Sequence, residues 1–263
     1  MINIKENILE RINDWKDESI YILTDFDKTI TDANSVNSWA ILSKYNLLPQ
    51  EYIEESNRDF NYYRPIELDY TLKAEEKQKM MKEWANKSFS LISEYITEDI
   101  IDKSTDDCNM HLRDGVKEFL AKMSEQNITV IIMSAGIGNI IKSFLKKENV
   151  LYDNIVLISN FFDFVNIKRH IDLESIMATS NKNYLKIPAQ LRQKLQKMDK
   201  IILIGDIIED TKLVEKEQIY KSITIGFLNA NIEENFEEYN KNFDIVITDN
   251  DDFNSIKEVL NFN

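Results

Sequence analysis

Six short runs of apolar residues, rich in isoleucine, recur along this chain of 263 residues. They cover residues 20–24, 128–133, 155–159, 201–204, 223–225 and 245–247. The runs are continuous rather than alternating, which is typical of strands in a parallel sheet covered on both faces. Segments with helical periodicity separate most of them. This alternation predicts an α/β fold with a doubly wound, Rossmann-like parallel sheet.

The helical segments are recognised by apolar residues that recur every three to four positions. The clearest set is Val116, Phe119, Leu120 and Met123, which would form one face of an amphipathic helix. We expect further helices around residues 140–145, 211–216, 233–240 and 253–260.

One long region interrupts the alternation, because no strand-like run occurs between residues 32 and 110. Apolar and small residues recur there with the spacing of one face of a long helix, at Met81, Trp84, Ser88, Leu91 and Tyr95. We therefore expect an all-helical cap at 32–110, inserted into a core made of residues 1–31 and 111–263.

The charge of the chain excludes some partners. The sequence has 46 acidic and 32 basic residues, a net charge of −14. Such a surface repels phosphate backbones, so neither nucleic acid nor an anionic membrane is an expected partner. The first residues do not resemble a signal peptide, and no apolar run reaches the roughly 18 residues of a membrane span. With a single cysteine and two histidines, the chain fits a reduced, cytoplasmic protein without a thiolate zinc site.

Two aspartates follow the first predicted strand, in the segment TDFDKTIT. Asp25 and Asp27 are two residues apart in an extended segment, so both side chains can face the same crevice at the carboxyl end of the sheet. Two close carboxylates repel each other unless a cation lies between them, and Mg²⁺ is the natural choice because it prefers oxygen ligands. The alternative is a solvated acidic turn.

Polar residues follow two other predicted strands. In IIMSAGIG, Ser134 follows the predicted strand, and we expect Gly136 and Gly138 to open a helix. A hydroxyl with backbone amides at a helix start could bind an anion. In LIGDIIED, Asp206 lies at a strand end, with Asp210 four residues later. A third carboxylate at this edge suits a Mg²⁺ site. Both segments could instead be ordinary helix caps.

Together these motifs resemble the haloacid dehalogenase superfamily of phosphatases. The resemblance implies that Asp25 is a nucleophile and Asp27 an acid/base. It also implies that a phosphate is bound by Ser134, the backbone of Ala135 and Gly136, and Lys182. The metal ligands that it implies for Mg²⁺ are Asp25, Asp27 through its backbone carbonyl, Asp206 and Asp210, the last of which could alternatively orient Lys182.

A narrower resemblance, from about residue 20 to the C-terminus, is to the cytosolic 5′-nucleotidase III family of pyrimidine 5′-nucleotidases. It rests on DFDKTIT, KEWANKS, SAGIGNII, LISNFFDF, SNKN and LIGDIIED. It implies that Glu67 and Trp84 contact the substrate. The chain departs from the family at three places: region 31–60 is shorter, Ala85 replaces a second aromatic residue, and Ile207 replaces a serine.

The expected function is that of a Mg²⁺-dependent phosphatase for a small phosphorylated metabolite, a pyrimidine nucleoside 5′-monophosphate in the first place. A phosphatase for a phosphoserine-like compound or a sugar phosphate would keep the same core residues and differ in the cap. A binding protein without catalysis is the alternative of a different class, because a fold alone does not imply an activity. The sequence leaves the oligomeric state open.

Overall fold

The computed structural model describes residues 1–15, 18–68, 72–106, 109–165, 168–248 and 252–260. Within these ranges, seven strands form the main sheet in the order β1-β9-β8-β7-β2-β3-β4. Their bounds are β1 Ile2–Ile4, β2 Ile20–Thr24, β3 Thr129–Ile137, β4 Ile155–Asn160, β7 Lys200–Gly205, β8 Ser222–Phe227 and β9 Ile245–Ile247. Neighbours pair in parallel, except that β1 runs antiparallel to β9. The predicted α/β fold with a parallel sheet is confirmed.

Strand β2 lies at the point where the strand order reverses. The chain leaves β2 for β3 and β4 on one side and later returns to β7 on the other. Thr24 of β2 is paired with Ile132 of β3 and with Ile204 of β7, so the three strands reach this level together. Open α/β sheets bind ligands at the carboxyl ends of strands at such a reversal.

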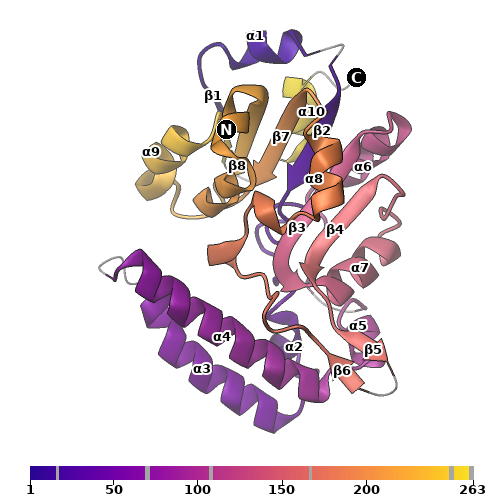
Figure 1. Cartoon of the computed structure of the whole chain (residues 1–263), viewed down its shortest axis with the longest axis vertical. Coiled ribbons are helices and arrows are strands. Elements are labelled where there is room, and N and C mark those ends of the chain that lie inside the picture. The colour runs from indigo at the N-terminus through magenta and orange to yellow at the C-terminus, as the bar shows by residue number, and fades with distance from the viewer. Residues whose placement is uncertain (16–17, 69–71, 107–108, 166–167, 249–251, 261–263) are drawn as a thin grey trace.

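Helices α1 (Ile8–Asn13), α6 (Val116–Glu125), α7 (Gly138–Lys147), α8 (Ala189–Leu195), α9 (Ile232–Asn242) and α10 (Phe253–Leu260) surround the sheet (Figure 1). The four apolar residues that predicted α6 are all fully buried. The helix expected at 211–216 is wrong: two 3₁₀ helices, Ile208–Leu213 and Lys216–Lys221, lie there instead. The Asp210 side chain accepts hydrogen bonds from the amides of residues 206 and 207, which closes a tight turn before a regular helix can form.

Strand β3 is longer than its apolar run predicted. It continues through Ser134 to Ile137, and α7 begins only at Gly138, so the expectation that Gly136 opens a helix is wrong. The reason is a further pairing with β4: Ile137 lies opposite Asn160, after a register shift that follows Met133.

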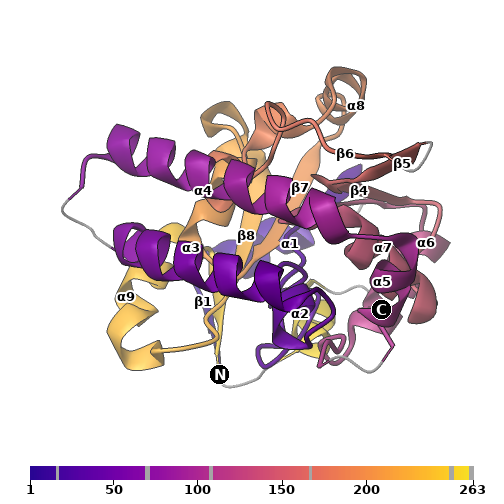
Figure 2. The same cartoon turned by 90° about the horizontal axis from the view of Figure 1, so that it is seen from below.

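The region between residues 32 and 110 contains α2 (Ile41–Lys44), α3 (Gln50–Leu68), α4 (Ala74–Tyr95) and α5 (Glu98–Lys103). Figures 1 and 2 show α3 and α4 side by side across the carboxyl ends of the strands. In the predicted stripe on α4, Met81 and Leu91 are buried, whereas Trp84, Ser88 and Tyr95 are partly exposed. A hairpin of β5 (Asp163–Val165) and β6 (Lys168–His170), which the sequence analysis did not predict, contacts α4. The division between core and cap at residues 31 and 111 stays a prediction.

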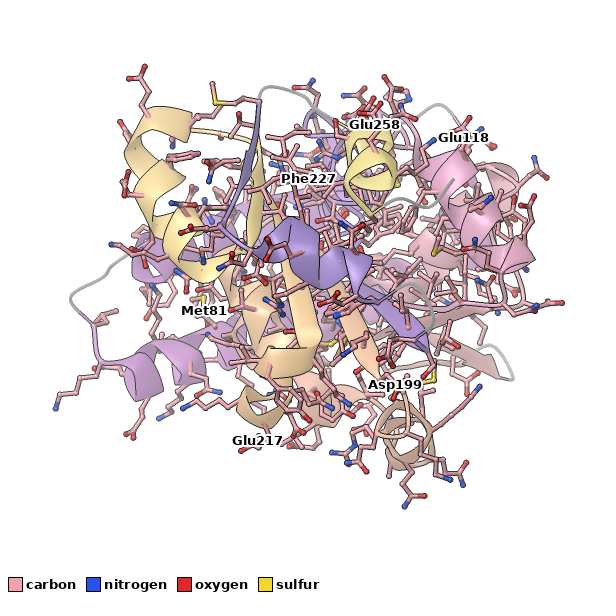
Figure 3. The ribbon with its side chains drawn as sticks, turned by 90° about the horizontal axis from the view of Figure 1, so that it is seen from above. Met81, Glu118, Asp199, Glu217, Phe227 and Glu258 are labelled. Atoms are coloured by element: carbon pink, nitrogen blue, oxygen red, sulfur yellow. The ribbon has the colours of Figure 1, made fainter. Side chains whose placement is uncertain are left out.

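Several of the acidic residues behind the net charge lie on the outside of the molecule. Figure 3 labels Glu118, Asp199, Glu217 and Glu258, which are exposed and belong to different parts of the fold, whereas Phe227 in the same view is buried. In the part of the chain that is described, no helix combines the length and the apolarity that a membrane crossing requires.

Candidate active site

Asp25 and Asp27 immediately follow β2, at the strand-order reversal. The Asp25 amide donates to the Ile204 carbonyl at 3.0 Å, which extends the pairing with β7 by one residue. Phe26, between the two aspartates, is fully buried and packs edge-on against Phe144. This apolar anchor fixes the loop between the carboxylates.

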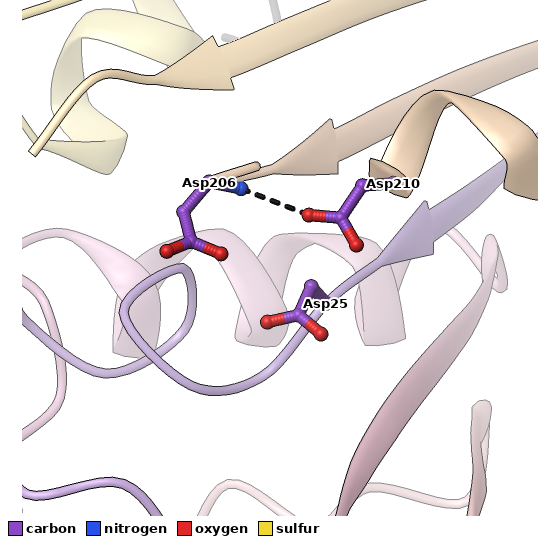
Figure 4. Close-up of side chains that lie close together, drawn as sticks. All are labelled: Asp25, Asp206 and Asp210. Carbon is purple, nitrogen blue, oxygen red and sulfur yellow. Dashed lines mark hydrogen bonds between the residues drawn. The ribbon is translucent and has the colours of Figure 1, made fainter. Parts of the chain in front are cut away.

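Asp25 belongs to a group of three carboxylates. One oxygen each from Asp25, Asp206 and Asp210 lies within 4.8 Å of the others, and Figure 4 shows the three side chains close together. The absence of a side chain at Gly205 makes this possible, because a Cβ there would lie 2.5 Å from Asp210 Oδ2. Asp25 and Asp206, which follow separate strands, therefore lie close together, and the roles assigned to them stay predictions.

Lys182 is buried among these carboxylates. Its Nζ lies 2.5 Å from Asp25 Oδ1 and 2.5 Å from Asp210 Oδ1, and its side chain is 3% exposed. Burial alone would lower the pKa of Lys182, but the attraction of Asp25 and Asp210 is stronger and raises it, so the amine is charged. The resemblance to known phosphatases had selected this lysine, which spacing alone did not.

Both oxygens of Asp210 have partners. Oδ1 contacts Lys182, and Oδ2 accepts from the amides of Asp206 at 3.1 Å and of Ile207 at 3.2 Å. Ile207, one of the departures from the family pattern, thus contributes through its backbone. Of the two roles considered for Asp210, the geometry favours the orientation of Lys182.

The carboxylates are costly to ionise together. Burial raises the pKa of Asp25 well above its usual value, and the neighbouring Asp210 and Asp206 raise it further against the opposing effect of Lys182. Burial, followed by the charge of Asp210, raises the pKa of Asp206 to about 7. One lysine therefore does not neutralise the group, and an additional cation would favour the ionised forms.

Asp27 has different partners. Its Oδ1 accepts from the Ser38 amide at 2.6 Å, and its Oδ2 accepts from the Ser38 hydroxyl at 2.7 Å. Burial raises the pKa of Asp27, and the two bonds from Ser38 oppose that rise. The side chain of Asp27 is outside the group formed by Asp25, Asp206 and Asp210. Ser38 was not predicted from the sequence, because it lies in a region without a recognisable pattern.

The predicted phosphate-binding residues of β3 lie beside Asp27. Ser134 Oγ accepts from the Gly136 amide at 3.0 Å. A Cβ at Gly136 would lie 1.9 Å from Ser38 Oγ and 3.2 Å from both Asp27 Oδ2 and Ser134 Oγ, so the extended end of β3 touches the acid/base candidate. Ala135, between Ser134 and Gly136 in the sequence, is partly exposed.

Asn160, which is 5% exposed, connects this strand end to the segment that carries Lys182. Its side-chain Nδ2 donates to the backbone carbonyls of Ala135 and Met177, each at 2.8 Å. Its Oδ1 accepts from the backbone amide of Met177 at 2.7 Å. This role of Asn160 was not predicted from the sequence, although the residue lies in the motif LISNFFDF.

The two residues expected to contact the substrate both lie on the long helices. Trp84 of α4 stacks on Tyr63 of α3, with ring centroids 5.7 Å apart and planes 9° apart, and Phe60 meets Trp84 edge-on. Ala85 is buried. Glu67 lies near the end of α3, but its side chain is outside the described part of the structure.

Solved structures that share this sheet include phosphoserine phosphatase with its substrate bound. That structure covers 94% of this chain with a TM-score of 0.55 and 16% identity, a likeness of fold alone. The fold, together with the family match that follows, defines a phosphatase of the haloacid dehalogenase class. Within that class, the chain belongs to the pyrimidine 5′-nucleotidase (UMPH-1) family, whose model matches residues 22–262. The protein is thus a phosphoric monoester hydrolase of the 5′-nucleotidase kind, as the sequence predicted.

Individual relatives support the same family. A 7-methylguanosine phosphate-specific 5′-nucleotidase of Drosophila melanogaster is 32% identical over 88% of this chain and 76% of its own length. The corresponding human protein is 28% identical over 92% of this chain and 84% of its own length. The structure of cytosolic 5′-nucleotidase IIIB bound to cytidine covers 99% of this chain and 93% of its own, with a TM-score of 0.83 and 28% identity.

A Gly136→Ala substitution is expected to damage activity more than stability. The new Cβ would lie 1.9 Å from Ser38 Oγ, so the hydroxyl must rotate away and lose its bond to Asp27. We expect a loss of about 1–2 kcal/mol in the free energy of unfolding and a roughly 10- to 100-fold fall in kcat/KM. In a protein that already carries Ser38→Ala, Gly136→Ala should lower kcat/KM little further, because the hydroxyl that it displaces is already absent. An unaltered kcat/KM in the single variant would contradict this account of the strand end.

Proposed function

We propose that the protein is a Mg²⁺-dependent 5′-nucleotidase that hydrolyses nucleoside 5′-monophosphates through an aspartyl-phosphate on Asp25. The observation that carries this proposal is the arrangement around Lys182. A buried amine lies between Asp25 and Asp210, beside Asp206, at the carboxyl edge of β2 and β7. Such an edge combines a nucleophile with positive charge for a phosphate.

In this mechanism Asp25 attacks the phosphorus atom in line with the leaving oxygen. Asp27 first protonates that 5′-oxygen and then removes a proton from the water that attacks the intermediate. Lys182, the Ser134 hydroxyl and the backbone amides of Ala135 and Gly136 would hold the remaining phosphoryl oxygens.

The acidic group suits a magnesium ion. Hard oxygen donors are what Mg²⁺ prefers. Burial, and after it the charge of neighbouring carboxylates, raises the pKa of Asp25 and of Asp206, and a bound cation would favour their ionised forms. We assign Asp25, Asp206 and the backbone carbonyl of Asp27 as ligands, with Asp210 beside them as the residue that orients Lys182. When bound, the ion would offset charge on the phosphoryl oxygens during transfer.

We further propose that the helices between residues 32 and 110 act as a cap that selects the substrate. Trp84 and Glu67 would contact the base, which in a pyrimidine 5′-nucleotidase family points first to CMP and UMP. The stacked rings of Trp84 and Tyr63 favour 7-methylguanosine monophosphate as a second candidate, because a methylated guanine is cationic and gains from a π face. Two of the relatives are named 7-methylguanosine phosphate-specific 5′-nucleotidases, which supports this second candidate, and the name cytosolic 5′-nucleotidase IIIB supports a cytoplasmic location.

The experiment is a phosphate-release assay on a panel of substrates with Mg²⁺ present. The panel contains CMP, UMP, 7-methylguanosine monophosphate, unmodified GMP, phosphoserine and glucose 6-phosphate. We expect release from one or more nucleotides, loss of release in EDTA, and full recovery after Mg²⁺ is added back. Release confined to phosphoserine or the sugar phosphate would contradict the nucleotidase assignment. Activity that survives EDTA would contradict the proposed dependence on Mg²⁺.

A further inference from the structure

One residue accounts for both side-chain hydrogen bonds of the proposed acid/base. The Ser38 amide donates to Asp27 Oδ1 at 2.6 Å, and the Ser38 hydroxyl donates to Asp27 Oδ2 at 2.7 Å. Two bonds to the two oxygens fix the plane of a carboxylate as well as its place, because rotation about the side chain would break both.

Ser38 is itself held firmly. It has no exposed surface, and its neighbours on either side are anchored to separate parts of the fold. The Val36 amide donates to the Asn109 carbonyl at 2.7 Å, and the ring of Trp39 meets Phe89 of α4 edge-on at 4.7 Å. The segment that holds Asp27 is thereby attached to the long helix that crosses the carboxyl edge of the sheet.

The surroundings of Ser38 connect it to the phosphate-binding strand end. Its hydroxyl occupies space that a side chain at Gly136 would need, and Asp27 Oδ2 and Ser134 Oγ border that same space. The Ser38 hydroxyl thus lies where the proposed acid/base and the proposed phosphate-binding backbone meet. A carboxylate free to turn here would lose its alignment with the leaving oxygen.

We propose that Ser38 is the positioning residue of Asp27, which keeps its carboxyl group aligned with the leaving oxygen and then with the attacking water. This inference rests on the proposed function. When the bond between phosphorus and the leaving oxygen breaks, the proton of Asp27 goes to that oxygen. When water attacks the phosphorus and the bond to Asp25 breaks, a water proton returns to Asp27. Ser38 transfers no proton and only reorients its hydroxyl, which can donate or accept.

The test compares two leaving groups in the wild type and in Ser38→Ala. A nucleotide needs a proton on its leaving oxygen, whereas 2,4-dinitrophenyl phosphate does not, because dinitrophenolate is stable without one. We expect kcat/KM for the nucleotide to fall roughly 10- to 100-fold in Ser38→Ala, and kcat/KM for the aryl phosphate to stay within about 3-fold. A Ser38→Thr variant, which keeps both donors, should recover most of the loss.

Ser35→Ala is the matched control, since Ser35 is also buried in this segment but its hydroxyl bonds to Asp32 and His111. It should change neither substrate's kcat/KM, and thermal unfolding of each variant checks that the fold is intact. Equal losses on both substrates in a folded Ser38→Ala protein, or no loss on either, would overturn the positioning role. A wild-type protein that hydrolyses neither substrate would instead overturn the proposed function.

Discussion

Asp25→Asn is expected to abolish hydrolysis while leaving the protein folded. The amide has the size of the carboxylate but is no nucleophile, so no aspartyl-phosphate can form. We expect kcat to fall by roughly 10⁴-fold or more for nucleotides and for 2,4-dinitrophenyl phosphate alike, because both need the same attacking atom. Steady-state phosphate release measures this directly.

The same substitution should not destabilise the fold. Lys182 keeps its contact with Asp210, and one buried negative charge is removed from a crowded group. Asp153→Asn, at an exposed aspartate, is the matched control and should retain wild-type activity. Residual activity of Asp25→Asn within about 10-fold of the wild type would mean that another group attacks the phosphorus.

Lys182→Ala is expected to reduce both activity and stability. Removal of the amine takes away the charge that would hold the phosphate and leaves Asp25 and Asp210 buried without it. Breaking a buried pair in this way costs about 3–5 kcal/mol, and the lost phosphate contact should lower kcat/KM roughly 10³-fold. Chemical denaturation and steady-state kinetics measure the two effects separately.

Magnesium offers a further check on Lys182→Ala. A divalent cation among the carboxylates should restore part of the lost stability, so the denaturation midpoint should depend on Mg²⁺ more strongly in the variant than in the wild type. Lys186→Ala, four residues further along, is the control and should leave activity unchanged. A Lys182→Ala protein as stable and as active as the wild type would contradict a central role for this lysine.

The sheet was predictable because its strands are continuous apolar runs buried on both faces. The six predicted strands correspond to β2, β3, β4, β7, β8 and β9. What the runs could not predict depends on pairing between distant segments. The end of β3 is extended by Ile137 opposite Asn160, and β1 is a three-residue strand held by β9. The turn at Ile208–Leu213 depends on where the Asp210 carboxylate finds donors.

The site was predictable to the extent that its residues follow strands. Asp25 and Asp206 are found this way, because parallel strands bring their carboxyl ends to one edge. Lys182 is 157 residues from its partner Asp25 and follows no strand directly, so only a resemblance selected it. Ser38 lies in a segment without periodicity, and Asn160 acts through backbone carbonyls, which leave no spacing signature in a sequence.

The central claim is that phosphate passes through a covalent bond to Asp25. The most direct measurement is to quench the wild-type protein during turnover of a nucleotide with Mg²⁺, reduce any acyl phosphate with borohydride, and locate the product by peptide mass spectrometry. The account predicts reduction of residue 25 to homoserine, dependent on substrate and absent without it. Active turnover with residue 25 unmodified, or with the reduced residue found elsewhere in the chain, would contradict it.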